Sequence, residues 1–228
     1  MKYEHLAADY KTFRFSRINE PAFRHLKLLL YWPLYLLMFQ FVERFFPVES
    51  YHVVYCALDD VIPFCEIFLI PYLAWFLELI FMTFYTVLYD IKTFRSFTKF
   101  IIITYSAALI IYMIYPTCQN LRPASFERNN VLTQFLQFVY AFDTNTNVCP
   151  SIHVLGALGV WFASKKLARF QSLGWKLFWQ FLTVLVCLST VFLKQHSILD
   201  ILAALPIAFI AYIVCFADRR EKQWLAYR

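Results

Sequence analysis

Two short stretches of the chain combine residues that could carry out nucleophilic or acid–base chemistry. In "CPSIHV", Ser151 stands two residues before His153, and in "KQHSILD", His196 stands four residues before Asp200. Residues four apart share one face of a helix, so Asp200 could accept a hydrogen bond from one nitrogen of His196 and leave the other free to attack. The alternative is that Asp200 only caps a helix, because a carboxylate is favourable at a helix N-terminus.

The residues around Ser151 favour binding of an anion. Pro150 suits the first turn of a helix, whose backbone N–H groups at Ser151 and Ile152 would then be free to bind a phosphate. Arg122 offers a planar fork of donors that suits phosphate, and His153 could protonate a leaving oxygen. Two rival interpretations are an interfacial role for His153 and a zinc site of two histidines and an aspartate. The adjacent cations argue against a metal.

The composition places these residues in a membrane protein. Of 228 residues, 61% are hydrophobic and 16% are charged, compared with about 45–50% apolar and about 25% charged in soluble domains. The chain has three glycines, which excludes a glycine-rich phosphate-binding loop. The net charge of +6 lies in short clusters between apolar runs. That pattern indicates membrane topology and argues against nucleic acid as a partner.

Six apolar runs are long enough to cross a hydrocarbon core of about 30 Å. They cover residues 28–42, 64–88, 100–115, 151–168, 175–193 and 197–216. The sequence therefore predicts an all-α integral membrane protein, with a bundle of six transmembrane helices in a domain over residues 28–228. A basic cytoplasmic segment over residues 1–27 precedes it; this segment could hold an amphipathic interfacial helix and has no apolar core typical of a signal peptide.

The distribution of Lys and Arg predicts the orientation of the bundle. Alternate connections, together with both termini, hold all of these residues except Arg44, Arg122, Arg128 and Lys194. Because cytoplasmic loops carry the excess of Lys and Arg, both termini are expected in the cytoplasm. The two chemistry-bearing stretches are then expected on the extracytoplasmic face.

Three motifs on this face resemble those of the type 2 phosphatidic acid phosphatase superfamily, which includes membrane lipid phosphatases and vanadium haloperoxidases. The family motifs are K-x-x-x-x-x-x-R-P, P-S-G-H and S-R-x-x-x-x-x-H-x-x-x-D. They correspond here to "YPTCQNLRP" (115–123), "PSIH" (150–153) and "STVFLKQHSILD" (189–200). The resemblance covers the chain from about residue 58 to its end, and a core of six spans is usual in the family.

The sequence departs from the family pattern at three positions. Tyr115, Ile152 and Thr190 stand where the family has lysine, glycine and arginine. Two of the family's three phosphate-binding cations are therefore missing, and Lys194 could supply one positive charge. The substitutions and the segment over residues 58–75 are more similar to the branch that contains inositol phosphorylceramide synthases, whose members transfer a phospho-headgroup to an alcohol.

The resemblance implies a mechanism that needs no metal and no cofactor. His196 would attack phosphorus to form a phosphohistidine, Asp200 would orient it, and His153 would protonate the departing alkoxide. The phosphate-binding residues would be Arg122, Ser151, Ile152, Ser189 and Lys194.

Three functions are open at this point. The first is a membrane lipid phosphate phosphatase that hydrolyses a phosphomonoester or diphosphate of a lipid. The second is a lipid phospho-headgroup transferase, and the third is a non-catalytic protein that binds a lipid phosphate. The expected partners are the lipid phosphate and membrane lipids.

Weaker features carry less specific expectations. We expect Glu78 to pack within the second span, His52 to lie in a loop, and residues 129–142 to form an interfacial or packing helix. Disulfides could form among four cysteines near the outer face, with Cys118–Cys149 as one possible pair: Cys56, Cys65, Cys118 and Cys149. Cys187 and Cys215 are expected to pack within spans.

Overall fold

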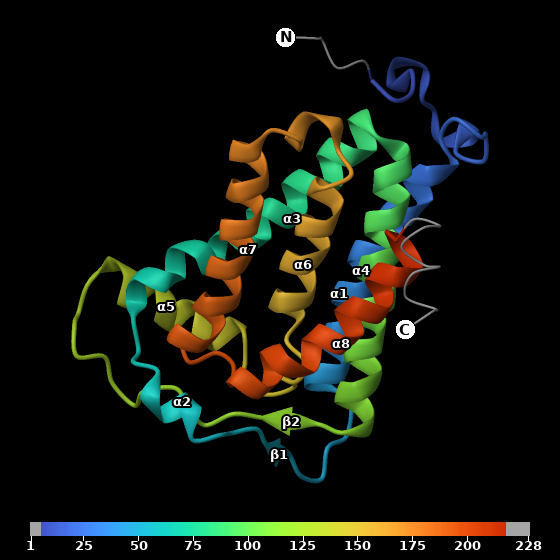
Figure 1. Cartoon of the computed structure of the whole chain (residues 1–228). Coiled ribbons are helices and arrows are strands. Elements are labelled where there is room, and N and C mark those ends of the chain that lie inside the picture. The colour runs from blue at the N-terminus through green and yellow to red at the C-terminus, as the bar shows by residue number, and fades with distance from the viewer. Residues whose placement is uncertain (1–5, 218–228) are drawn as a thin grey trace, which may run out of the picture.

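The computed structural model of the chain describes residues 6–217, which are mostly helical (Figure 1). The α-helices are α1 (Tyr31–Arg44), α2 (Leu58–Val61), α3 (Leu69–Tyr89), α4 (Ile91–Ile114), α5 (Val131–Phe142), α6 (Ile152–Ser164), α7 (Leu173–Phe192) and α8 (Ile198–Cys215). Short 3-10 helices cover Tyr10–Thr12, Phe15–Arg17, Arg24–Leu30, Glu66–Phe68 and Ala168–Phe170. The strands β1 (His52–Val53) and β2 (Thr117–Cys118) pair in parallel, with His52 opposite Thr117.

Five helical segments within residues 6–217 are long and apolar enough to cross a membrane. They are Arg24–Arg44, Glu66–Tyr89, Ile91–Ile114, Leu173–Phe192 and Ile198–Cys215. This confirms a multi-pass helical membrane protein. The helix observed within the predicted span over residues 151–168 is shorter than predicted. Helix α6 has 13 residues and is about 20 Å long, which is less than the thickness of a hydrocarbon core, about 30 Å. The prediction counted apolar residues across Lys165 and Lys166, where this helix has already ended.

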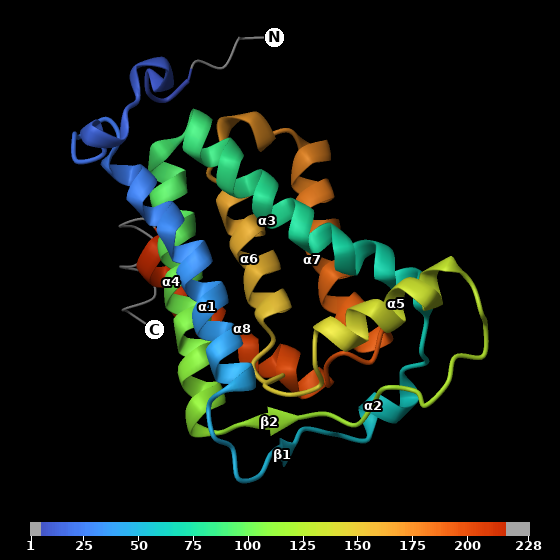
Figure 2. The same cartoon turned by 180° about the vertical axis from the view of Figure 1, so that it is seen from behind.

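Helix α6 forms the centre of the bundle. Nine of its residues are buried, and it contacts α3, α4, α7 and α8, which surround it in both views (Figures 1 and 2). Gly159 allows α4 to approach closely, since a Cβ at this position would lie 2.9 Å from a ring carbon of Phe100. The first turn of this central helix carries His153.

Helices α3 and α4 meet without a loop. Asp90 ends α3 and caps α4, accepting a hydrogen bond from the backbone N–H of Thr93 at 2.9 Å, as short acidic side chains do at helix N-termini. The third span therefore begins at Ile91 instead of residue 100. The basic residues 92, 95 and 99, which were expected in a loop, belong to the first turns of α4.

The N-terminal segment differs from the expected amphipathic helix. Residues 10–12 and 15–17 form only 3-10 turns, and Tyr10 donates a hydrogen bond to the carbonyl oxygen of Val87 at 2.5 Å. This bond ties the segment to the end of α3. The 3-10 helix over residues 24–30 continues directly into α1, so the predicted boundary at residue 27 falls within a continuous helical run.

The connections gather at the two ends of the bundle. The N-terminal segment, the α3–α4 junction and the α6–α7 connection lie at one end, and β1, β2, α2, α5 and the α7–α8 turn lie at the other (Figures 1 and 2). This agrees with the predicted alternation of cation-rich and cation-poor connections. That the cation-rich end faces the cytoplasm remains a prediction. The counted cations Lys2, Arg219, Arg220, Lys222 and Arg228 lie outside the described residues.

Candidate active site

His196 and Asp200 meet at the start of α8. Nδ1 of His196 lies 3.0 Å from Oδ2 of Asp200, which confirms the predicted contact. They do not share a helical face, however, because His196 lies in the turn before α8. Ser197 is the N-cap, and its backbone N–H also donates to Oδ2 of Asp200 at 3.0 Å. The carboxylate therefore both caps α8 and holds the imidazole.

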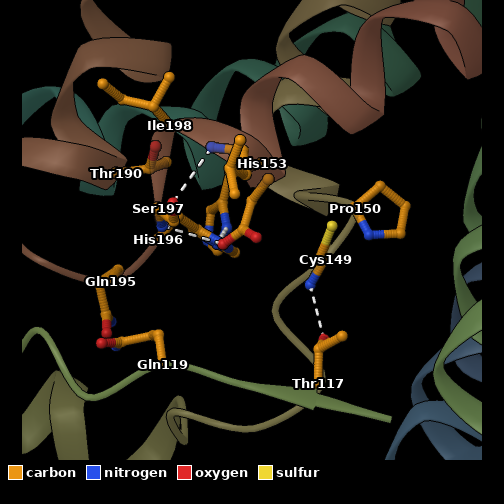
Figure 3. A network of polar contacts seen from close by, with 12 residues as sticks. Thr117, Gln119, Cys149, Pro150, His153, Thr190, Gln195, His196, Ser197 and Ile198 are labelled. Atoms are coloured by element: carbon orange, nitrogen blue, oxygen red, sulfur yellow. Dashed lines mark hydrogen bonds and ion pairs between the residues drawn. The ribbon is translucent and has the colours of Figure 1, made fainter. Parts of the chain in front are cut away.

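His153 of α6 contacts His196 from the opposite side. Nδ1 of His153 lies 3.2 Å from Nε2 of His196, and both side chains are buried. When Asp200 accepts a hydrogen bond from the Nδ1–H of a neutral His196, Nε2 of His196 is an acceptor, and His153 must donate a hydrogen bond to it from Nδ1. The three side chains therefore form a buried line of carboxylate, imidazole and imidazole. Figure 3 shows His153 and His196 beside Ser197, the N-cap of α8.

Asp143, which the sequence did not single out, adds a second carboxylate to this line. Its Oδ2 lies 3.9 Å from Nε2 of His153 and accepts hydrogen bonds from the Tyr72 hydroxyl and from Nε2 of Gln195. Desolvation raises the pKa of Asp143 above its usual range, because burial penalises the charged carboxylate. In the tautomer above, Nε2 of His153 is an acceptor, so a proton held between Asp143 and His153 would satisfy both groups.

Aromatic residues and backbone hydrogen bonds fix the position of His153. The rings of Tyr72 and Trp75 on α3 lie 4.7 and 4.3 Å from its ring, centre to centre. The hydroxyl of Tyr112 on α4 donates to the carbonyl oxygen of Pro150 at 2.6 Å. The backbone N–H of Ser151 donates to the carbonyl oxygen of Asp200 at 3.2 Å. The last bond ties the N-terminus of α6 directly to that of α8.

Two of the predicted phosphate-binding residues, Ser151 and Ile152, lie beside the histidines. The hydroxyl of Ser151 is buried and has no hydrogen-bond partner within residues 6–217. Ile152 lines a small cavity next to both imidazoles, and its N–H belongs to the first helical turn, where such groups have no partner within the helix. The backbone N–H of Ser151, which was predicted to be free for a phosphate, donates instead to the carbonyl oxygen of Asp200, so this part of the prediction is wrong. The Ser151 hydroxyl and the N–H of Ile152 are the groups left at the N-terminus of α6 that could bind an anion.

Arg122 lies close to the histidines, but most of its donors are already used. Nη1 donates to the carbonyl oxygen of Tyr140 at 3.0 Å. Nη2 donates at 2.5 Å to the carbonyl oxygen of Asp143 and at 2.5 Å to Oε1 of Gln195. Arg122 Nε has no partner among the described residues. Arg122 therefore contacts Gln195, and Gln195 lines the small cavity next to the two histidines.

The other two predicted phosphate-binding residues point elsewhere. Nζ of Lys194 donates at 2.6 Å to each of the carbonyl oxygens of Asp59 and Ile62. The positive φ of Lys194, 54°, places it in a tight turn from which its side chain reaches α2. The hydroxyl of Ser189 donates to the carbonyl oxygen of Val186 at 2.6 Å within α7. The predicted phosphate-binding set is therefore corrected by the removal of Lys194 and Ser189.

Two of the three departures from the family motifs, Tyr115 and Thr190, direct their side chains away from the histidine nitrogens, whereas Ile152 lies beside them. The ring of Tyr115 stacks on that of His52, with centres 4.0 Å apart. The hydroxyl of Thr190 donates to a carbonyl oxygen of its own helix. All six cysteines are free thiols, so the possible Cys118–Cys149 disulfide is not formed. Burial raises the pKa of Cys149 to about 12, which keeps this thiol protonated at neutral pH.

Two hollows meet at His153. The small cavity beside the histidines has a volume of about 20 Å³, enough for about one water. A groove of about 520 Å³ runs between α1 and α3 and is lined mainly by apolar side chains. Asp143, Ile152 and His153 line both hollows, so the groove leads directly to the histidines.

Comparison with protein-family models, with curated proteins and with solved structures finds no match. The resemblance stated above therefore remains a prediction from three motifs.

Proposed function

We propose that the protein is a membrane lipid phosphate phosphatase of the type 2 phosphatidic acid phosphatase kind. It would hydrolyse a phosphomonoester or diphosphate of a lipid through a phosphohistidine. The observation that carries the proposal is the buried line of Asp200, His196 and His153 at the end of a membrane helix bundle. Such a line supplies an oriented nucleophile and a neighbouring proton donor.

In the first step, Nε2 of His196 attacks phosphorus, and the bond from phosphorus to the leaving lipid oxygen breaks. Asp200 stabilises the imidazolium that develops, through the 3.0 Å contact with Nδ1. His153 gives its Nδ1 proton to the departing oxygen and takes up at Nε2 the proton that it shares with Asp143, so it remains a neutral imidazole. We expect the N–H of Ile152, with the Ser151 hydroxyl, to bind the phosphoryl oxygens at the N-terminus of α6.

In the second step, a water oxygen attacks the phosphorus of the phosphohistidine while His153 accepts a proton from that water. The P–N bond breaks, and its electron pair returns to Nε2 of His196. The two imidazoles are in direct contact at 3.2 Å, and the cavity beside them is small. Binding of the phosphoryl group must therefore replace the hydrogen bond between the two rings.

The groove between α1 and α3 supports a lipid as the substrate. One of its walls extends from Leu29, in the 3-10 helix that precedes α1, to Gln40 of α1. This wall covers about 16 Å of helix, about half the thickness of a hydrocarbon core. The two helices diverge toward the end that carries β1 and β2, with α6 between them (Figure 2). A hydrocarbon chain in this groove would lead from one leaflet of the membrane to His153.

A lipid phospho-headgroup transferase is the second candidate, and the charges around the site favour it. The Nη groups of Arg122 and the ammonium of Lys194 are bound to other groups, and Asp143 faces His153. Such a site suits a singly charged phosphodiester better than a dianionic phosphomonoester. In this reaction His153 would deprotonate an acceptor hydroxyl instead of water.

Phosphate release distinguishes these functions. Purified protein in detergent with EDTA is given a panel of short-chain lipid phosphates, with and without diacylglycerol or ceramide as acceptor. His196→Ala is the inactive control, and Lys194→Met is a matched variant that removes a cation outside the site. We expect release without acceptor that is abolished only in His196→Ala.

The alternative outcomes identify the other functions. Headgroup transfer that requires an acceptor, with no release into water, would assign the protein to the transferases. If the protein binds the lipid phosphates but neither releases phosphate nor transfers a headgroup, the proposal is overturned. The protein would then be a non-catalytic lipid-phosphate-binding protein.

A further inference from the structure

The wall of the groove between α1 and α3 contains three hydrogen-bond donors without a partner among the described residues. They are the hydroxyls of Tyr35 and Tyr105 and the indole N–H of Trp75. All three residues line the groove, with exposed fractions of 4%, 1% and 5%, respectively. The three polar atoms themselves are closed to solvent, so an acceptor in the groove reaches them only when these side chains shift. Buried donors in proteins are almost always paired, so three in one apolar wall indicate a place for a polar acceptor.

Two of these donors converge at one point on α6. A Cβ at Gly156 would lie 2.5 Å from the hydroxyl oxygen of Tyr105 and 2.6 Å from Nε1 of Trp75. The ring of Tyr35 packs against that of Tyr105, with centres 4.8 Å apart. Gly156 follows His153 by three residues, about 4.5 Å along the helix axis. The donors therefore lie about one helical turn deeper in the membrane than the histidines.

We propose that these donors bind the carbonyl oxygen of an acyl linkage in the lipid substrate, an ester or an amide. This inference rests on the proposed function, which places the lipid's phosphate at His153 and His196. A carbonyl oxygen has two lone pairs and no proton, so it fits a wall in which the indole N–H can only donate. With the phosphate at the histidines, the acyl linkage lies beside the donors and the hydrocarbon chain fills the rest of the groove.

The proposal selects among lipid classes. Glycerolipids with ester linkages and sphingolipids with an amide both present a carbonyl oxygen a few bonds from the phosphate. An isoprenoid phosphate presents only hydrocarbon at this depth and leaves the three donors unpaired. One hydrogen bond to a neutral carbonyl changes affinity by about two- to tenfold, so two such bonds give a measurable preference.

A binding assay without turnover tests the proposal. Binding of tritiated dioctanoylglycerol to the purified full chain in detergent is competed with four unlabelled lipids: dioctanoylglycerol, its dioctyl ether analogue, octanoylsphingosine and an isoprenoid alcohol. For the wild-type protein we expect the ester or the amide to compete at least about fourfold better than the ether and the isoprenoid. We expect this preference to fall at least about twofold in the Tyr35→Phe/Tyr105→Phe variant, which keeps both rings and the indole N–H of Trp75.

Tyr31→Phe is the matched control on α1. The Tyr31 hydroxyl lies 3.1 Å from the Ser106 hydroxyl oxygen and is not part of the groove wall, so the carbonyl preference should be unchanged. Equal competition by ester and ether, or an unchanged preference in the double variant, would overturn the inference. A preserved preference without phosphate release would instead reject only the phosphatase proposal. The order of ester and amide identifies a glycerolipid or a sphingolipid.

Discussion

Asp200→Asn tests the proposed role of the buried carboxylate in holding the nucleophile. The substitution keeps the size of the side chain and an oxygen that can accept from the backbone N–H of Ser197, so the cap of α8 survives. It removes the negative charge 3.0 Å from Nδ1 of His196. A charge-assisted hydrogen bond contributes about 1.5–3 kcal/mol and a neutral one about 0.5–1.5 kcal/mol. The difference of about 1–1.5 kcal/mol corresponds to about tenfold in rate.

We therefore expect kcat to fall at least about tenfold, and by up to about 10⁴-fold if the new amide N–H reverses the tautomer of His196. KM should change little, because Asp200 does not line either hollow. The assay is steady-state release of phosphate from a short-chain lipid phosphate, with thermal unfolding measured on the same samples.

Asn130→Ala is the control for stability. Asn130 caps α5 by accepting from the backbone N–H of Thr133 at 3.0 Å, so its removal should cost about 1 kcal/mol of stability without lowering kcat. If Asp200→Asn keeps the wild-type kcat and pH profile, the carboxylate does not hold the nucleophile and the reasoning is refuted.

Three further predictions follow from other contacts. Because burial raises the pKa of Asp143, the folded protein holds this proton more tightly than the unfolded chain, and stability is lost as pH rises through the folded-state pKa, from about 4 upward. In Asp143→Asn the thermal unfolding temperature should depend less on pH in this range. An unchanged dependence would contradict the prediction. Lys194→Met should cost about 1–3 kcal/mol of stability, because two hydrogen bonds to carbonyl oxygens are lost, and should leave KM unchanged. A raised KM would instead indicate that Lys194 binds the phosphate. Gly156→Ala should cost about 1–3 kcal/mol by overpacking against Tyr105 and Trp75. In the same unfolding assay Gly174→Ala, which meets no atom within 4 Å, should be neutral, and equal effects would argue against the close packing at α6.

The helical membrane fold could be predicted from composition, but the length of one element could not. Apolar runs and the positions of Lys and Arg identified the long helices and sorted their connections to two ends. Helix α6 was predicted too long because hydropathy does not distinguish a helix that faces lipid from one surrounded by protein. Gly159 allows the ring of Phe100 to pack closely against α6. A glycine within this apolar run could have indicated that the helix is surrounded by other helices.

Part of the site could also be predicted. The spacing of His196 and Asp200 predicted their contact, and the shared end of the bundle predicted that His153 would join them. Asp143 was missed because an acidic residue in a connecting loop is usually solvated, and only the tertiary fold turns it toward His153. Lys194 was wrongly placed at the phosphate because its left-handed turn could not be read from its distance to His196 in sequence.

The most direct test of the account is to trap the phosphorylated intermediate. Purified protein is mixed with a lipid phosphate labelled with ³²P, quenched within milliseconds in alkali, and digested for mass spectrometry. The account predicts a label that is stable in base and labile in acid, on Nε2 of His196, and absent in His196→Ala. A reaction that proceeds with no labelled histidine, or with the label on another residue, would contradict the central claim.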